Sequence, residues 1–179
     1  IFKQRTLKNN QVAAGLALYA EWKRFGFTLH TNYANLMDYN QIGLGGAITW
    51  YPTGNLKSWI RMHGTWFSEE GTTRWVLEPS AGIKLSNHIW FESSVALGDM
   101  TRYVDETNFL VYNTDDKTTL RAQGVFYIPV FDNVMFSVRY IFNRAEGSLY
   151  QYDLTEASLV RESIDYNKHT ILGGIKWNF

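Results

Sequence analysis

Charged and polar side chains recur at alternate positions along stretches whose other positions are apolar. The set with this spacing comprises Arg61, His63, Glu78, Lys84, Glu92, Arg121, Arg139 and Lys176. If these side chains share one face of a sheet, they line a polar interior that leans cationic. Fixed positive charge lowers the barrier to anions, so the set indicates a water-filled passage for anionic solutes. The alternative is an internal network of ion pairs and hydrogen bonds that joins neighbouring strands.

Histidine and serine residues are the candidates for metal binding and catalysis. Of the four histidines, only His30 and His63 are expected to share the polar face, and no H-E-x-x-H spacing accompanies them. Ser93 or Ser94 near a histidine would suit a hydrolase, but their spacing matches no nucleophile motif. We therefore expect no metal site, no cofactor and no enzymatic activity.

The elements that must position these residues are β-strands, because side chains alternate in character with a period of two. In residues 12–22, for example, Leu16 and Leu18 alternate with Ala17 and Tyr19. The same pattern recurs along the chain. It predicts nine strands, at residues 9–22, 25–34, 42–51, 56–69, 73–86, 88–104, 117–131, 134–145 and 166–179.

The predicted links between strands alternate between two kinds. Short turns rich in residues that tolerate turn backbone fall at 23–24, 53–55, 86–88 and 132–133. Longer or more polar links fall at 38–41, 69–72, 103–116 and 146–165, and the last of these has room for an additional hairpin. Most acidic residues lie at or near the second kind of link. Short turns on one rim and long loops on the other are typical of outer-membrane barrels.

Strand length and the distribution of charge favour a membrane barrel over a soluble one. The predicted strands have about 12–15 residues, against a usual mode near 5–6. Their apolar faces carry almost no charge, as expected where an Arg in hydrocarbon costs about 2–4 kcal/mol. Aromatic residues make up 16% of the chain while the mean hydropathy is −0.26. We expect one all-β domain over residues 1–179, a transmembrane, antiparallel, up-and-down β-barrel.

The last predicted strand carries the one resemblance to a known class of protein. Ile171, Gly173, Ile175, Trp177 and Phe179 alternate with other residues up to the final Phe. This pattern resembles the C-terminal signal of outer-membrane β-barrel proteins, and the chain looks like barrels of Gram-negative bacteria in the Bacteroidota style, without matching a named family. The resemblance implies a bacterial outer-membrane location, contact with outer-membrane lipid, and recognition of the last strand by the barrel-assembly machinery.

The odd strand count bears on completeness and function. Bacterial single-chain barrels usually have an even number of strands, so nine strands predict the C-terminal part of a larger barrel rather than a small complete one. A channel or transport-type protein is the leading expectation. The alternative is a structural barrel with a plugged interior that binds other outer-membrane or periplasmic proteins. The 17 basic and 17 acidic residues cancel, so net charge offers no argument for nucleic acid binding.

Overall fold

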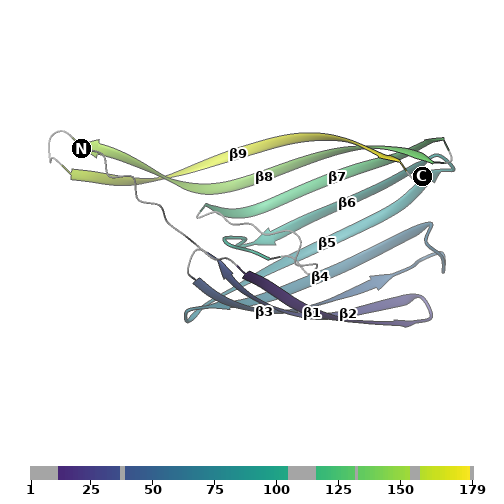
Figure 1. Ribbon diagram of the computed structural model, residues 1–179, viewed down its shortest axis with the longest axis horizontal. Coiled ribbons are helices and arrows are strands. Elements are labelled where there is room, and N and C mark those ends of the chain that lie inside the picture. The colour runs from purple at the N-terminus through teal and green to yellow at the C-terminus, as the bar shows by residue number, and fades with distance from the viewer. Residues whose placement is uncertain (1–11, 37–38, 105–115, 132, 154–157, 178–179) are drawn as a thin grey trace.

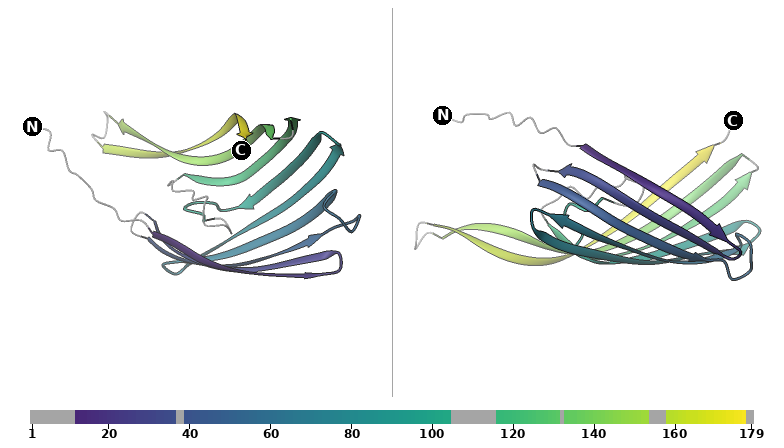
Figure 2. Two further views of the ribbon diagram at one scale, coloured as in Figure 1. Left: turned by 45° about the vertical axis from the view of Figure 1, so that its right-hand side comes forward. Right: turned by 90° about the horizontal axis from the view of Figure 1, so that it is seen from below.

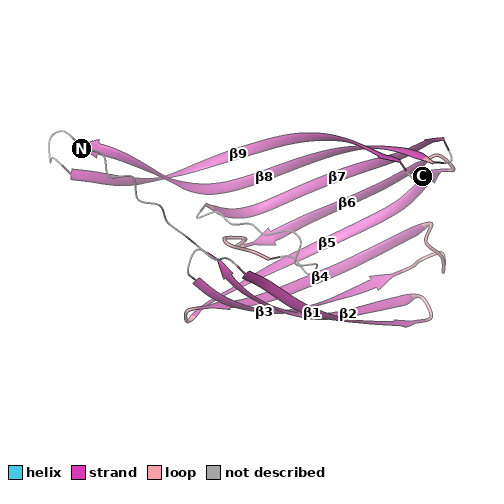
Figure 3. Ribbon diagram, viewed as in Figure 1, coloured by secondary structure: helices cyan, strands magenta, loops and turns pink. Residues whose placement is uncertain are grey.

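The structure is a computed structural model that describes residues 12–36, 39–104, 116–131, 133–153 and 158–177, with the side chains of 149–153 and 158–161 excepted. Its strands are β1 (Val12–Trp22), β2 (Phe25–Leu36), β3 (Tyr39–Trp50), β4 (Ser58–Glu69), β5 (Thr72–Ser86), β6 (Ile89–Gly98), β7 (Lys117–Phe131), β8 (Val134–Asp153) and β9 (Ser158–Trp177). The described residues contain no helix, which Figure 3 shows. The prediction of an all-β chain with nine strands is therefore confirmed.

All nine strands form one antiparallel sheet in sequence order, so every strand pairs with its neighbours along the chain (Figure 1). The predicted up-and-down topology is confirmed. The sheet is strongly curved, as the two views of Figure 2 show, but it does not close, because β1 and β9 each have one unpaired edge among the described residues. No helix in the described part of the chain is long and apolar enough to cross a membrane.

The two faces of the sheet differ sharply, because the period of two sends successive side chains to opposite sides. On β2, Phe27 and Leu29 are exposed on one face, whereas Thr28, His30 and Asn32 are buried on the other. The register continues this division into β3, where Ala47 lies opposite Thr28 and Ile48 lies opposite Phe27. The buried side chains all belong to the concave face, and the large exposed apolar side chains of the strands belong mostly to the convex one.

One of the links predicted to be longer or more polar, at 69–72, is a tight turn. Glu70 and Gly71 alone connect β4 to β5. Their φ angles are both positive, 46° for Glu70 and 84° for Gly71, and at the second position Gly adopts such an angle without steric cost. Between β2 and β3 only residues 37–38 lie outside the strands. At 69–72 the polar residues therefore belong to a turn at the rim. The predicted contrast between a short-turn rim and a long-loop rim is therefore wrong at the β4–β5 connection, whereas residues 37–38 lie outside the described residues.

The link predicted at 146–165 is also wrong, because most of it is strand. β8 and β9 pair continuously from Val134 opposite Trp177 to Asp153 opposite Ser158. β7 pairs with β8 only as far as Lys117 opposite Glu146, so the rest of the β8–β9 hairpin extends past the sheet as a two-stranded ribbon (Figure 1). The segment lengthens an existing hairpin and adds no strand.

The predicted strand 88–104 ends early, at Gly98, whose φ of 130° suits Gly and takes the chain out of the sheet. The described part of the connection to β7, residues 99–104, lies inside the curve of the sheet (Figure 2). Met100, Tyr103 and Val104 are buried there. We call residues 99–104 the inner segment. Its apolar residues continued the period-two pattern of β6, which explains the error.

Candidate functional site on the concave face

All eight residues predicted to line a polar interior belong to the concave face. Residues that pair directly across antiparallel strands point to the same side of a sheet. Arg61 pairs with Ser80, His63 with Glu78, and Val125 pairs with both Glu92 and Arg139. The remaining three fall on the same face by register: Lys84 opposite Trp90, Arg121 opposite Asn143, and Lys176 opposite Met135. The sequence pattern thus located one polar surface across six strands.

Four of the five residues of the C-terminal pattern occupy the opposite, convex face of β9. Ile171, Ile175 and Trp177 are exposed, and a Cβ at Gly173 would meet nothing within 4 Å. Phe179, the last residue of the pattern, lies outside the described residues. The other four residues lie on β9, which is an edge strand of the sheet. Among the described residues, β9 pairs only with β8.

An ionic cluster joins the inner segment to the end of β4. Glu69 is 7% exposed and receives Arg74 Nη2 at 2.6 Å. Arg102 of the inner segment donates to both carboxylate oxygens of Glu69, with Nε 3.2 Å from each. The Arg102 guanidinium also lies 4.2 Å from the centre of the Tyr39 ring, a cation–π distance. Arg74 further donates to the Thr101 carbonyl oxygen, so the cluster holds the segment at two points.

Apolar packing against the sheet also holds the inner segment in place. The Tyr103 ring meets Phe67 of β4 edge-on, with centroids 5.1 Å apart at 90°, the arrangement that aromatic quadrupoles favour. Met100 joins this cluster, and Val104 packs with a second one on β2. The Met100 amide also donates to the Thr118 carbonyl oxygen at 3.0 Å. The inner segment therefore occupies the concave face near the rim where β4 and β6 end.

Two buried histidines lie deeper on this face, on β2 and β4. Their ring centroids are 5.1 Å apart, and Thr65 Oγ1 lies 3.3 Å from His30 Nε2 and 3.1 Å from His63 Nε2. Gly45, between them on β3, leaves the space that the His30 ring fills, because a Cβ there would collide with that ring. The prediction that His30 and His63 share the polar face is confirmed.

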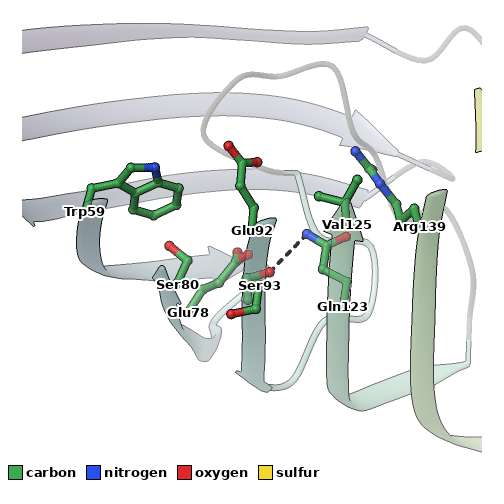
Figure 4. Close-up of a pocket in the computed structure, with 9 residues that line it drawn as sticks. Trp59, Glu78, Ser80, Glu92, Ser93, Gln123, Val125 and Arg139 are labelled. Carbon is green, nitrogen blue, oxygen red and sulfur yellow. Dashed lines mark hydrogen bonds between the residues drawn. The ribbon is translucent and has the colours of Figure 1, made fainter. Parts of the chain in front are cut away.

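A pocket of about 170 Å³ lies toward the other rim, between β4 and β8. Figure 4 shows its lining side chains projecting from these strands into a common space. They include Trp59, Glu78, Ser80, Glu92, Gln123 and Arg139. Trp59 lies over Gly82, where a Cβ would collide with the indole. The pocket combines an aromatic side chain, two carboxylates, a guanidinium and neutral hydrogen-bonding groups.

The charged side chains of the pocket and its surroundings are sorted by strand. Trp59, Gly82, Glu92, Val125 and Arg139 form one row of directly paired residues from β4 to β8. Glu92 Oε1 accepts a hydrogen bond from Trp90 Nε1 at 2.7 Å, which fixes the carboxylate. In the neighbouring row, Gln123 donates to Ser94 Oγ at 3.0 Å and accepts from Arg121 at 3.2 Å. Carboxylates thus come from β5 and β6, and guanidinium groups from β7 and β8.

Sequence reasoning missed three parts of this surface. Glu69 was predicted at the long-loop rim and Arg102 fell within the predicted strand 88–104, so only their contact across 33 positions reveals the ionic cluster. Trp59 was not singled out, although its place two residues before Arg61 put it on the same face. Tyr103 was assigned to a strand end, and no local signal distinguishes a strand from a segment that folds back over the sheet.

In the part of the chain that the structure describes, no three His, Asp or Glu side chains gather closely enough to hold a metal ion. The arrangement instead offers a polar, charge-sorted surface backed by an apolar one. Comparison of the chain with known protein families, with curated proteins and with solved structures finds no match.

Proposed function

We propose that this chain forms part of the wall of a bacterial outer-membrane β-barrel whose concave face lines a passage for small polar solutes. The observation that carries the proposal is the division of one long-stranded sheet into a charged concave face and an apolar, exposed convex face. Soluble monomers rarely expose contiguous apolar patches larger than a few hundred Å². Here Leu44, Trp66 and Trp75, among many others, are exposed on the convex face. Lipid is the environment in which that exposure costs nothing.

The membrane setting makes a demand on the free edges of β1 and β9. Unpaired backbone groups cannot face hydrocarbon, where each costs several kcal/mol, so the proposal requires the sheet to close by pairing these edges. The C-terminal pattern on β9 fits a role for this strand in assembly. We propose that the barrel-assembly machinery recognises Ile171, Gly173, Ile175, Trp177 and Phe179. Replacing Trp177 and Phe179 with Ala should reduce the folded protein in the outer membrane several-fold, whereas replacing Asn178 with Ala should not.

The inner segment favours one alternative, a barrel with a filled interior that serves as a structural or partner-binding protein. Met100, Tyr103 and Val104 are buried against the concave face, and Arg102 is fixed by Glu69. This packing obstructs the interior near one rim. Neither proposal includes a catalytic activity.

Planar-bilayer recording of the purified protein separates the two proposals. A passage predicts stepwise ionic currents with a preference for anions, since the eight predicted lining residues include five cationic side chains and two carboxylates. Replacing Arg121 and Lys176 together with Gln should move the reversal potential toward that of a cation-preferring pore. Replacing Arg144, which lies on the convex face of β8, should not. A protein that folds into lipid but stays electrically silent contradicts the passage and supports the filled barrel.

A further inference from the structure

We infer that the pocket between Glu92 and Arg139 binds small zwitterionic solutes, of the size of an amino acid or a dipeptide. The inference rests on the proposed passage and names its solute class. It follows from the separation of opposite charges along one pocket: Glu78 and Glu92 lie on β5 and β6, and Arg139 lies on β8. A solute with an ammonium group at one end and a carboxylate at the other matches this arrangement.

The pocket charges remain available to a ligand. Within the described residues, neither Glu78 nor Arg139 takes part in a hydrogen bond or ion pair, although both line the same pocket. Glu92 is held through Oε1 by Trp90, and its other carboxylate oxygen is uncommitted among these residues. A partly buried charged group is stabilised by a counter-charge, and the described residues form no ion pair with Glu78, Glu92 or Arg139. A zwitterion would supply both counter-charges at once.

The spacing fits a short solute. Glu92 and Arg139 lie in one row, with only Val125 of β7 between them. Adjacent strands are about 4.8 Å apart, so the two backbones are about 10 Å apart, and the side chains shorten this gap to the reach of a dipeptide. A volume of about 170 Å³ is below that of drug-sized sites and suits a small molecule. The Val125 side chain, which is buried, supplies an apolar surface between the charges.

The other four cations among the eight predicted lining residues do not line the pocket. Arg61 and Lys84 lie on the carboxylate side of the sheet, on β4 and β5, but neither lines the pocket. Two further cations of the eight predicted lining residues, Arg121 and Lys176, lie with Arg139 on β7–β9. Ammonium groups should therefore point toward Glu78 and Glu92, and carboxylates toward Arg139.

Isothermal titration of the folded protein in lipid nanodiscs tests the inference with three matched ligands. Glycylglycine carries both charges, N-acetylglycylglycine lacks the ammonium, and glycylglycinamide lacks the carboxylate. We expect saturable binding of glycylglycine that is about tenfold or more tighter than either analogue, the loss that one charge-assisted contact accounts for. Equal binding of all three ligands, tighter binding of a neutral disaccharide, or no saturable binding overturns the inference.

Single substitutions assign each charge to its wall. Arg139→Gln should weaken glycylglycine about tenfold and leave glycylglycinamide unchanged, because that ligand has no carboxylate to lose. Glu92→Gln should weaken glycylglycine and leave N-acetylglycylglycine unchanged. Arg144→Gln, on the same strand as Arg139 but on the convex face, is the control and should change neither. Equal effects of Arg139→Gln on both ligands contradict the assignment.

Conductance, recorded separately, keeps this inference distinct from the proposed function. A protein that conducts ions but binds no zwitterion overturns the inference alone. A protein that binds glycylglycine with the charge dependence above, yet never conducts, supports the pocket and overturns the passage. If it neither conducts nor binds, both are wrong.

Discussion

Glu69, the last residue of β4, binds Arg102 of the inner segment through both of its carboxylate oxygens, and so ties part of the β6–β7 connection to the concave face. Arg74 shares the same carboxylate. One buried acid therefore compensates two guanidinium groups. Removing one partner of a buried ion pair costs about 3–5 kcal/mol, because the remaining charge loses its compensation.

Glu69→Gln should accordingly release the inner segment. The expected result is faster amide hydrogen exchange over residues 99–104, together with a lower free energy of unfolding. Glu70→Gln is the matched control, because Glu70 is the exposed neighbour in the β4–β5 turn. If the inner segment obstructs a passage, the Glu69 variant should also show larger ionic currents. Unchanged exchange over these residues would contradict the role given to this ion pair.

The convex face should reject charge far more strongly than the concave one. Leu16 lies in the middle of β1 and is 63% exposed on the convex face, while Ala17 faces His30 on the concave side. We expect Leu16→Arg to lower the free energy of folding into phospholipid vesicles by about 2–4 kcal/mol, the cost of Arg at mid-bilayer. Ala17→Arg should cost much less. Urea titrations in vesicles measure both, and equal losses would contradict the lipid-facing assignment.

The packing beside the buried histidines should leave no room for a methyl group at Gly45. A Cβ at Gly45 would collide with the His30 ring and lie 2.7 Å from the Gly64 carbonyl oxygen. Gly45→Ala should therefore destabilise the fold by about 1–3 kcal/mol, the usual cost of overpacking. At Gly64 the nearest atom to an added Cβ is a Leu77 methyl at 3.8 Å, so Gly64→Ala should be almost neutral. Denaturant midpoints of the two variants would be indistinguishable if the packing were loose.

The extended β8–β9 hairpin can be tested with a designed disulfide, since the chain contains no cysteine. Ser148 and Ser163 are directly paired, and Cα atoms across antiparallel strands lie about 4.5–5.5 Å apart, within disulfide range. The double variant Ser148→Cys, Ser163→Cys should oxidise readily, as read from peptide masses without reductant. Ser148→Cys with Asn167→Cys is four positions out of register and should not. Equal oxidation of both pairs would indicate a flexible loop at this point.

Local pattern was enough to predict the strands and their faces. The period of two at residues such as Leu16, Ile48 and Ile175 depends only on each strand itself, because a side chain's side of the sheet follows from its position along the chain. This is why nine strands and a single polar face carrying eight named residues could be predicted from the sequence. Strand ends were less certain where apolar alternation continued past Gly98 into the inner segment, or where polar residues such as Glu146 sat within a strand.

Partnership between distant residues was decided only by the tertiary structure. The sequence alone predicts Glu69 as a solvated acid at a loop. In the structure the inner segment brings Arg102, 33 positions away, into contact with Glu69, and this positive charge makes burial of the carboxylate favourable. The row from Trp59 to Arg139 likewise depends on the register of four strand pairs. Register is set by interactions between strands rather than within them, so the sequence alone determined which face each charge occupies, and the fold determined which charges meet there.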